Sequence, residues 1–221
     1  MKILYGIRRI KRFPLPVVAI GVFDGVHLGH REILESAVRK AKDIGGTSMA
    51  LTFWPHPQKE ESLYSLEHRL KLIGSLGLDV GIVIRFSDQF ANNPADDFIR
   101  KLLVKKIGVS FVYIGKNFRF GKGARGGLSL LQEAGKSYHF GVEAFDVVRA
   151  QGKTVSSTNI RRIIKKGNLR LAQELLTRPV SILGTVIKGV SLGRKLGIPT
   201  ANIDPHHEVI PPQGVYAVRV I

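Results

Sequence analysis

Residues 17–30 read VVAIGVFDGVHLGH and combine an apolar run, three glycines and two histidines. The β-branched run at 17–20 is typical of a strand that is buried on both faces of a parallel sheet. The glycines that follow allow the backbone to turn sharply and let a ligand approach it closely. Apolar residues then recur at helical spacing from 33 to 44. The stretch therefore predicts a strand, a glycine-rich turn and a helix.

The two histidines stand where this helix is expected to begin. His27 and His30 are three residues apart, so both imidazoles can project from the same side of its first turn. Unpaired backbone N–H groups and the positive end of the helix dipole lie beside them, and this is where proteins bind anions. Capping or a surface position is the alternative for isolated histidines. The glycines and the strand-to-helix context favour a phosphate site.

A second stretch with the same chemistry occurs at residues 155–161, VSSTNIR. Ser156, Ser157 and Thr158 place hydroxyl groups at the start of a predicted helix, and Arg161 follows one turn later. Helix capping accounts for one of the serines but not for the whole order of residues. We therefore expect a second anion cradle here.

Predicted strands alternate with predicted helices along most of the chain. The strands are expected at 17–20, 48–53, 80–84, 111–114 and 142–148, and the helices at 33–44, 66–76, 94–103, 157–166 and 169–176. This order indicates a mainly parallel sheet with right-handed crossovers. Open sheets of this kind bind ligands at the carboxyl ends of their strands. His56, in a Pro-His-Pro turn after the second of these strands, could face either the ligand or solvent.

The loop at residues 115–127, GKNFRFGKGARGG, combines glycines, basic residues and two phenylalanines. Its Gly121-x-Gly123-x-x-Gly126 pattern matches the dinucleotide fingerprint formally, but it does not follow the first strand, so a Rossmann dehydrogenase is only a weak alternative. Phe118 and Phe120 could stack on a planar ring system or pack in the core.

Four ordered motifs carry a resemblance to a known family. Residues 21–30 resemble the His-x-Gly-His element of the nucleotidyltransferase superfamily, and the Phe-Asp-Gly sequence within them is similar to the version in bacterial bifunctional riboflavin kinase/FMN adenylyltransferases, also called FAD synthetases. The GKNFRFG loop, the Ser-Ser-Thr-x-Ile-Arg order and the sequence GVSLGRKLGIPTAN at 189–202 resemble further elements of that family. The resemblance extends over residues 17–218.

The resemblance implies an α/β fold with two parts. Residues 1–178 are expected to form a Rossmann-like nucleotidyltransferase domain with a parallel sheet. Residues 179–221 are expected to form the start of a β-barrel riboflavin kinase domain, and the sequence GVYAV at 214–218 is similar to its next strand. The kinase domain is expected to be incomplete, because the family's catalytic carboxylate comes from a segment further along.

The resemblance also implies an activity. FMN would be joined to the AMP part of ATP with the help of Mg²⁺, giving FAD and pyrophosphate. The family also phosphorylates riboflavin to FMN with ATP, which residues 179–221 suggest but would not carry out alone. The partners are then small nucleotides and flavins.

The family's site residues carry over to matching positions in this chain. His27, His30 and Arg161 would be the catalytic groups, with the histidines on the α-phosphate and on the leaving pyrophosphate. The residues implied to bind ATP are Gly21, Phe23, Asp24, Gly25, Gly29, Ser157, Thr158 and Arg161. Asp24 is expected to orient the glycine-rich turn, and Ser157 and Arg161 to hold the β- and γ-phosphates.

Two further sets of residues carry over in the same way. Asn117, Phe118 and Phe120 would recognise the flavin or the nucleotide. Thr200 and Asn202 provide hard oxygen ligands that suit Mg²⁺ in the kinase domain.

The composition limits the class of protein. The chain of 221 residues has a formal net charge of +17 and no cysteine. No apolar run approaches the ~18 residues that span a bilayer, and the basic N-terminus lacks the apolar core of a signal peptide, so we expect a cytoplasmic protein. The basic residues are scattered rather than gathered in one arm, which argues against nucleic-acid binding. A protein that handles polyphosphates already has a use for positive charge.

Two alternatives to FMN adenylylation remain open. A related transferase could use the same scaffold on another phosphorylated acceptor, such as phosphopantetheine or a nicotinamide nucleotide. A non-enzymatic module that binds nucleic acid would instead show steeply salt-dependent binding and no product from FMN. The sequence does not indicate the oligomeric state.

Overall fold

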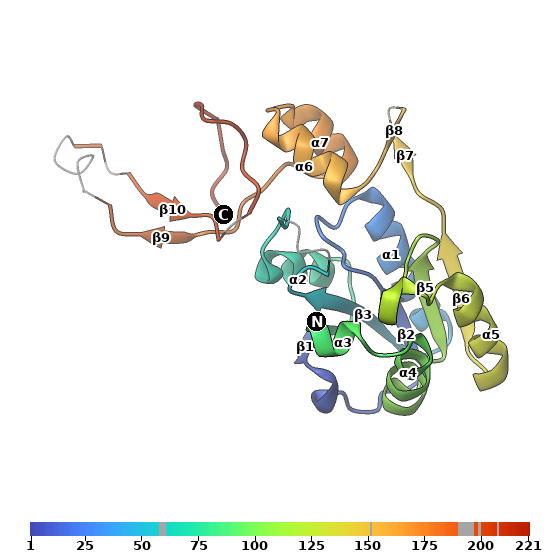
Figure 1. Cartoon of the computed structure of the whole chain (residues 1–221). Helices are drawn as coiled ribbons and strands as arrows, with labels where there is room; N and C mark the ends of the chain where they lie inside the picture. Colours follow the sequence, from blue (N-terminus) through green and yellow to red (C-terminus); the bar gives the residue numbers. More distant parts are fainter. Residues whose placement is uncertain (58–60, 151, 190–196, 199, 207) are drawn as a thin grey trace.

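A six-stranded parallel sheet forms the centre of the molecule, with strands in the order β1-β4-β3-β2-β5-β6 (Figure 1). The computed structural model describes residues 1–57, 61–150, 152–189, 197–198, 200–206 and 208–221. The strands of the sheet are β1 (Lys2–Tyr5), β2 (Pro16–Ile20), β3 (Thr47–Trp54), β4 (Val80–Arg85), β5 (Phe111–Gly115) and β6 (Gly141–Phe145).

The apolar strand β2 lies inside this sheet, and every one of its residues is buried. It pairs with β3 on one side, with Val18 opposite Met49, and with β5 on the other, with Val18 opposite Val112. The chain adds β3 and β4 on one side of β2 and then crosses to add β5 and β6 on the other. The order of strands therefore reverses between β2 and β5, and such a reversal opens a crevice at the carboxyl ends of the strands.

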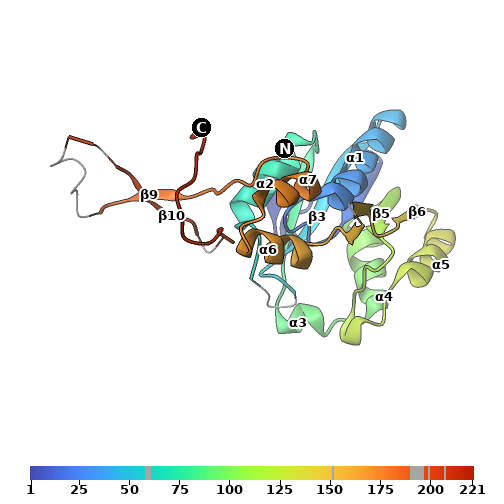
Figure 2. The same ribbon diagram turned by 90° about the horizontal axis from the view of Figure 1, so that it is seen from above.

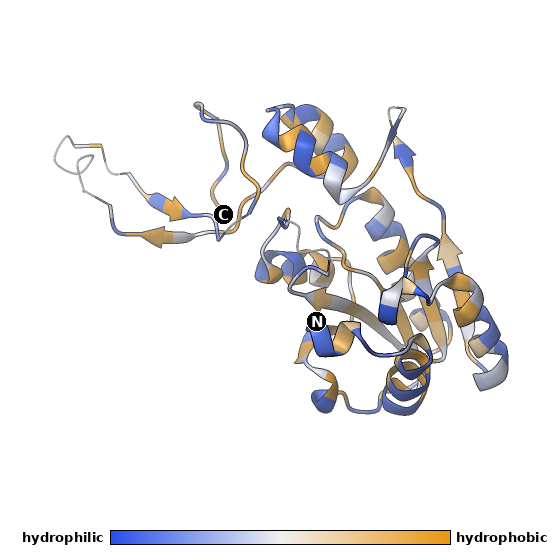
Figure 3. Cartoon of the chain, in the orientation of Figure 1, coloured by the Kyte–Doolittle hydropathy of each residue, from blue (hydrophilic) through white to orange (hydrophobic). Residues whose placement is uncertain are grey.

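Helices cover both faces of the sheet (Figures 1 and 2). One apolar cluster joins β2 to α1 (Leu28–Asp43) and to the end of α2 (Leu66–Ser75). The other joins the opposite face to the π-helical segment η2 (Phe98–Ile107) and to α5 (Leu128–Tyr138). In Figure 3 the inner strands are mostly hydrophobic while the helices alternate, as a sheet between two amphipathic layers requires. The smaller helical elements are η1 (Ile7–Arg9), α3 (Asp88–Ala91), α4 (Ala95–Asp97) and η3 (Lys122–Ala124).

A third apolar cluster lies at one end of the sheet. It contains buried residues of α6 (Ser157–Lys165) and α7 (Leu169–Leu176), which follow the short antiparallel pair β7 (Arg149–Ala150) and β8 (Lys153–Thr154). Leu63, Tyr64 and Val209 complete this cluster, and each of them is at most 2% exposed. Side chains from distant parts of the chain thus share one core.

The structure confirms most of the predicted elements and adds several short ones as well as β1 and α5. The side chains of Ser65, Ser156 and Asn168 cap α2, α6 and α7, since each accepts a hydrogen bond from a backbone N–H in the first turn of its helix. The strand expected at 142–148 is shorter and ends at Phe145. Sequence reasoning did not predict β1 or α5. With four residues, β1 is too short to show a periodicity.

The C-terminal segment contains a small hairpin that projects from the body in Figures 1 and 2. It consists of β9 (Thr185–Ile187) and β10 (Asn202–Asp204), which pair antiparallel. The strand expected at 214–218 is absent, because in the described part of the chain no strand lies beside these residues to bond with them. Of the motif at 189–202, residues 190–196 and 199 lie outside the described residues.

Among the described residues, no helix combines the length and the apolar character that crossing a membrane requires.

A core substitution tests this arrangement. Leu34 on α1 is fully buried against the sheet, so Leu34→Ala leaves a cavity and is expected to lower the free energy of unfolding by about 2–5 kcal/mol. Leu15→Ala, at a residue 50% exposed, is the control and is expected to change it by less than about 0.5 kcal/mol. Urea unfolding followed by circular dichroism measures both. Equal effects of the two substitutions would contradict this packing.

Candidate active site

A cavity of about 1100 Å³ opens at the carboxyl ends of the strands, where their order reverses. It is lined from the ends of β2, β5 and β6, from the start of α1 and from the start of α6. Both predicted anion cradles contribute to it, because His27 and His30 line it together with Ser157 and Thr158. Segments about 130 residues apart in the sequence therefore face one cavity, as two cradles acting on one ligand require.

The two histidine rings lie against each other at the start of α1. Their centroids are 3.6 Å apart and their planes differ by 17°, and the ring of Phe23 meets His30 edge-on. His27 is the N-cap of α1, and its Nδ1 accepts a hydrogen bond from the backbone N–H of His30 at 3.4 Å. Because Nδ1 accepts, Nε2 carries the proton of the neutral ring. In His30, Nδ1 is buried and has no hydrogen-bond partner among the described residues.

Both histidines are neutral at pH 7. Burial, aided by the positive charge of Arg178, lowers the pKa of His27 to about 4. Burial also holds the pKa of His30 well below its usual range, with smaller contributions from His27, Arg69 and Arg178. The rings therefore offer N–H donors to a phosphate rather than full positive charges.

The turn between β2 and α1 is backbone-strained. Phe23, Gly25 and Val26 have φ values of 54°, 82° and 41°, in the left-handed region. Glycine adopts this conformation freely, but a β-branched valine does so only when its surroundings force it. A Cβ atom on Gly25 would lie 2.6 Å from Leu63 Cδ1, so this glycine serves close packing. Gly25 does not line the cavity, in contrast to Gly21 and Gly29, and its contact with ATP stays a prediction.

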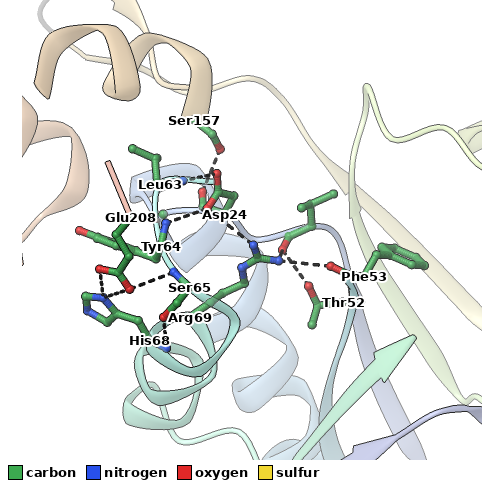
Figure 4. Close-up of polar contacts among 12 residues, drawn as sticks. Asp24, Thr52, Phe53, Leu63, Tyr64, Ser65, His68, Arg69, Ser157 and Glu208 are labelled. Atoms are coloured by element: carbon green, nitrogen blue, oxygen red, sulfur yellow. Dashed lines mark hydrogen bonds and ion pairs between the residues drawn. The ribbon is translucent and has the colours of Figure 1, made fainter. Parts of the chain in front are cut away.

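Asp24 holds this turn from behind (Figure 4). Its carboxylate is 1% exposed and accepts hydrogen bonds from the backbone N–H groups of Leu63 at 2.9 Å and Tyr64 at 3.3 Å. The guanidinium groups of Arg69 and Arg161 lie 3.7 and 3.5 Å from its oxygens. Asp24 does not line the cavity, and its contacts suit the predicted role of orienting the turn, whereas its direct contact with ATP stays a prediction.

Arg161 also supports Asp24. Its side chain is 11% exposed, pairs with Asp24 and is absent from the cavity lining. The physical reason is that a buried carboxylate needs positive partners, and Arg161 is on the face of α6 that meets Asp24. Ser157, on the same helix, donates its hydroxyl hydrogen to the Asp24 carbonyl at 2.8 Å and lines the cavity. The hydrogen bond from Ser157 to Asp24 therefore links the start of α6 to the turn before α1.

Arg69 and Arg178 complete the support of the turn, and neither was singled out from the sequence. Arg69 is fully buried and donates to the carbonyl of Val22 at 3.0 Å. Arg178 donates to the carbonyls of Val26, at 2.9 Å, and of Gly25. Both act on backbone carbonyls, and such contacts leave no pattern in a sequence.

The opposite part of the cavity is aromatic. The predicted residues Phe118 and Phe120 line it and stack with ring centroids 5.7 Å apart. Phe120 also belongs to the core, so both interpretations of this residue hold. The cavity is lined by further aromatic rings that the sequence did not predict as binding residues. Among them is Phe98, which belongs to the helix expected at 94–103. The additional phenylalanines in the lining are Phe53, Phe86, Phe90, Phe98 and Phe145.

The remaining predicted residues divide into two groups. Asn117 and Phe23 line the cavity, and so does His56, which is 9% exposed. Thr200 and Asn202 are exposed and do not line the cavity. No group of three or more His, Cys, Asp or Glu side chains in the described ranges could hold a metal ion.

Comparisons with known proteins show the family of the chain. Residues 11–159 match the family model described as FAD synthetase, and residues 176–221 match the one described as riboflavin kinase. The chain is 37% identical to the bifunctional riboflavin kinase/FMN adenylyltransferases of Buchnera aphidicola from Schizaphis graminum and of Escherichia coli K12. All of this chain is covered in both comparisons, with 73% and 74% of the relatives. For the enzyme of that name from Haemophilus influenzae the identity is 38%, over 92% of this chain and 68% of the relative.

A solved structure shares the fold. The crystal structure described as a macrolide-efflux protein from Streptococcus pneumoniae superposes with a TM-score of 0.82 at 26% sequence identity. The superposition covers 98% of this chain and 73% of that one, so the likeness extends into the C-terminal segment.

The low pKa of His27 makes stability depend on pH. The unfolded chain binds a proton at His27 near pH 6.5 and the folded chain only near pH 4, so the folded state loses stability as the pH falls through this window. The loss from this residue approaches about 1.4 kcal/mol per pH unit. His27→Asn keeps a capping side chain and removes the titration, so its free energy of unfolding should fall less steeply between pH 6.5 and 4.5.

Urea unfolding at a series of pH values measures this difference. His139→Asn changes an exposed histidine at the end of α5 and is expected to retain the parent's slope. If His27→Asn retained the parent's slope as well, His27 would not be buried in its neutral form.

Proposed function

The chain belongs to the family of bifunctional riboflavin kinase/FMN adenylyltransferases, and we propose that its cavity is where FMN is joined to the AMP part of ATP. The reaction makes FAD and pyrophosphate. The observation that carries the proposal is that two anion cradles and a set of aromatic rings line the same cavity. A nucleoside triphosphate and a flavin phosphate present these two chemistries.

The transfer is a single in-line displacement in this proposal. A phosphate oxygen of FMN attacks the α-phosphorus of ATP and forms the new P–O bond, while the bond to the bridging oxygen breaks and its electron pair leaves with pyrophosphate. No covalent enzyme intermediate is needed. The protein then contributes positioning and stabilisation of the developing negative charge.

His27 and His30 are the proposed catalytic residues. Their neutral rings donate N–H hydrogen bonds to the α-phosphate and to the leaving pyrophosphate, beside the free N–H groups at the start of α1. Donors that are aimed in advance at the developing charge stabilise the transition state more than the substrate.

The start of α6 is the proposed site for the outer phosphates. The hydroxyl groups of Ser157 and Thr158 line the cavity there. Because Arg161 pairs with Asp24, we assign it a positioning role and not a direct contact with the phosphates. We propose that Mg²⁺ is held mainly by the phosphates of ATP, a common arrangement for this ion, and that it offsets their charge when bound.

The aromatic part of the cavity is the proposed flavin site. The stacked pair Phe118 and Phe120 offers flat apolar surface to the isoalloxazine ring, and Asn117 offers an amide to its polar edge. This surface also argues against phosphopantetheine, which has no ring at its reactive end.

The second activity of the family, phosphorylation of riboflavin with ATP, involves the segment at 179–221 in this proposal. The two parts remain 1–178 for adenylyl transfer and 179–221 for the start of the kinase domain. Thr200 and Asn202 are the proposed Mg²⁺ ligands of that second reaction. We propose the cytoplasm as the location, since both activities consume ATP.

Two histidine variants test the proposed catalytic roles. His27→Asn and His30→Asn each remove an imidazole N–H donor, and each is expected to lower kcat for FAD formation from FMN and ATP with Mg²⁺ by on the order of 100-fold or more. His139→Asn, away from the cavity, should match the parent. Chromatography of FAD over time measures all three. Rates for His27→Asn and His30→Asn within a few-fold of the parent would contradict the proposal.

A third variant tests the flavin site. Phe118→Ala removes half of the stacked pair, and because stacking on an aromatic side chain contributes about 1–3 kcal/mol, the KM for FMN is expected to rise about tenfold or more. The KM for ATP should stay within about twofold. Tyr138→Ala, at an exposed ring on α5, is the control. A rise in the KM for ATP alone would reverse the proposed orientation of the two substrates.

A further inference from the structure

A second buried carboxylate lies behind the active-site turn and belongs to the C-terminal segment (Figure 4). Glu208 is 4% exposed and does not line the cavity. Its Oε1 accepts hydrogen bonds from the backbone N–H of Ser65 at 2.9 Å and from His68 Nδ1 at 3.0 Å, and its Oε2 accepts from the backbone N–H of Leu183 at 3.1 Å. One side chain thus binds α2 and the C-terminal segment together.

The protonation of this group follows from its partners. A carboxylate only accepts hydrogen bonds, so Nδ1 of His68 carries a proton, while Nε2 contacts the hydroxyl of Ser181 at 3.2 Å. Burial opposes the charge on Glu208, but the hydrogen bonds from His68, Ser65 and Leu183 outweigh it, and its pKa lies below the usual range. Glu208 is therefore charged at neutral pH and accepts hydrogen bonds from three donors.

Glu208 binds the segment at residues 63–65, and the same segment positions Asp24. Ser65 follows directly after Leu63 and Tyr64, whose N–H groups donate to the Asp24 carboxylate. Val209 binds the same stretch, because its N–H donates to the carbonyl of Leu63 at 3.3 Å and its side chain is buried beside Leu63. The side chain of Leu63 in turn packs closely against Gly25.

These contacts form a continuous path from the C-terminal segment to the catalytic histidines. We propose that Glu208 is a positioning residue for adenylyl transfer, which acts through residues 63–65 and Asp24 on the turn that carries His27. The inference rests on the proposed function of the cavity. It extends the functional adenylyltransferase unit beyond residue 178, into the segment that matches the riboflavin kinase model.

The variant Glu208→Gln tests the proposal with little change of shape. Glutamine replaces one acceptor oxygen by an NH₂ group, so in either orientation a buried backbone N–H, of Ser65 or of Leu183, faces another donor. We expect kcat for FAD formation to fall by on the order of 10- to 100-fold, with less effect on the KM for FMN. Amides of residues 63–65 should exchange hydrogen faster.

The control and the coupling test use the same assay. Asp204→Asn changes an exposed carboxylate four residues earlier and should match the parent. His68→Gln should lower kcat as well, and the double variant with Glu208→Gln should lose less than the product of the two single effects, because both act through one contact. A Glu208→Gln protein with kcat within twofold of the parent would overturn the proposal.

A measurement on the unaltered chain covers the case in which the variant does not fold. If the turn and the C-terminal segment are coupled, MgATP alone should slow hydrogen exchange at residues 63–65 and also at 181–183 and 208–209, by linkage. Slower exchange confined to the cavity would overturn the inference. If the parent makes no FAD, the proposed function fails; if it makes FAD and Glu208 has no effect, only this inference fails.

Discussion

The buried carboxylate of Asp24 is the constraint on which the active-site turn depends. A carboxylate in a protein interior is very costly unless it is paired and hydrogen-bonded. Here its partners are two backbone N–H groups and the guanidinium groups of Arg69 and Arg161, which come from three separate segments. Satisfying this one charge therefore brings these segments to the turn and holds residues 23–26 in a backbone conformation that they would not adopt alone.

The electrostatics of the cavity follow from the same arrangement. The chain carries a large positive charge, yet the two histidines that face the ligand are neutral, because burial and nearby arginines disfavour their protonation. The arginines that contact the turn lie behind it and bind carbonyl or carboxylate oxygens. In the proposed reaction the phosphates would therefore meet N–H and O–H donors at two helix starts, while the buried positive charge holds the turn that carries the histidines.

The C-terminal region from Arg178 onward has two structural roles. Its hairpin, β9 and β10, projects from the body, whereas Arg178, Glu208 and Val209 contact the turn and its supporting residues. The boundary between the two family matches therefore does not coincide with a boundary between separate cores. A substitution in the segment that matches riboflavin kinase can reach the adenylyltransferase site through residues 63–65.

The sequence by itself determined the fold class, the order of most strands and helices, and the four cavity groups His27, His30, Ser157 and Phe118, because these depend on local periodicity and on motifs with fixed spacing. The tertiary structure decided which residues face the ligand and which stand behind it. Arg161 pairs with Asp24, and five further phenylalanines line the cavity without any motif. These contacts join residues that are up to about 140 positions apart, and their geometry exists only once the chain has packed.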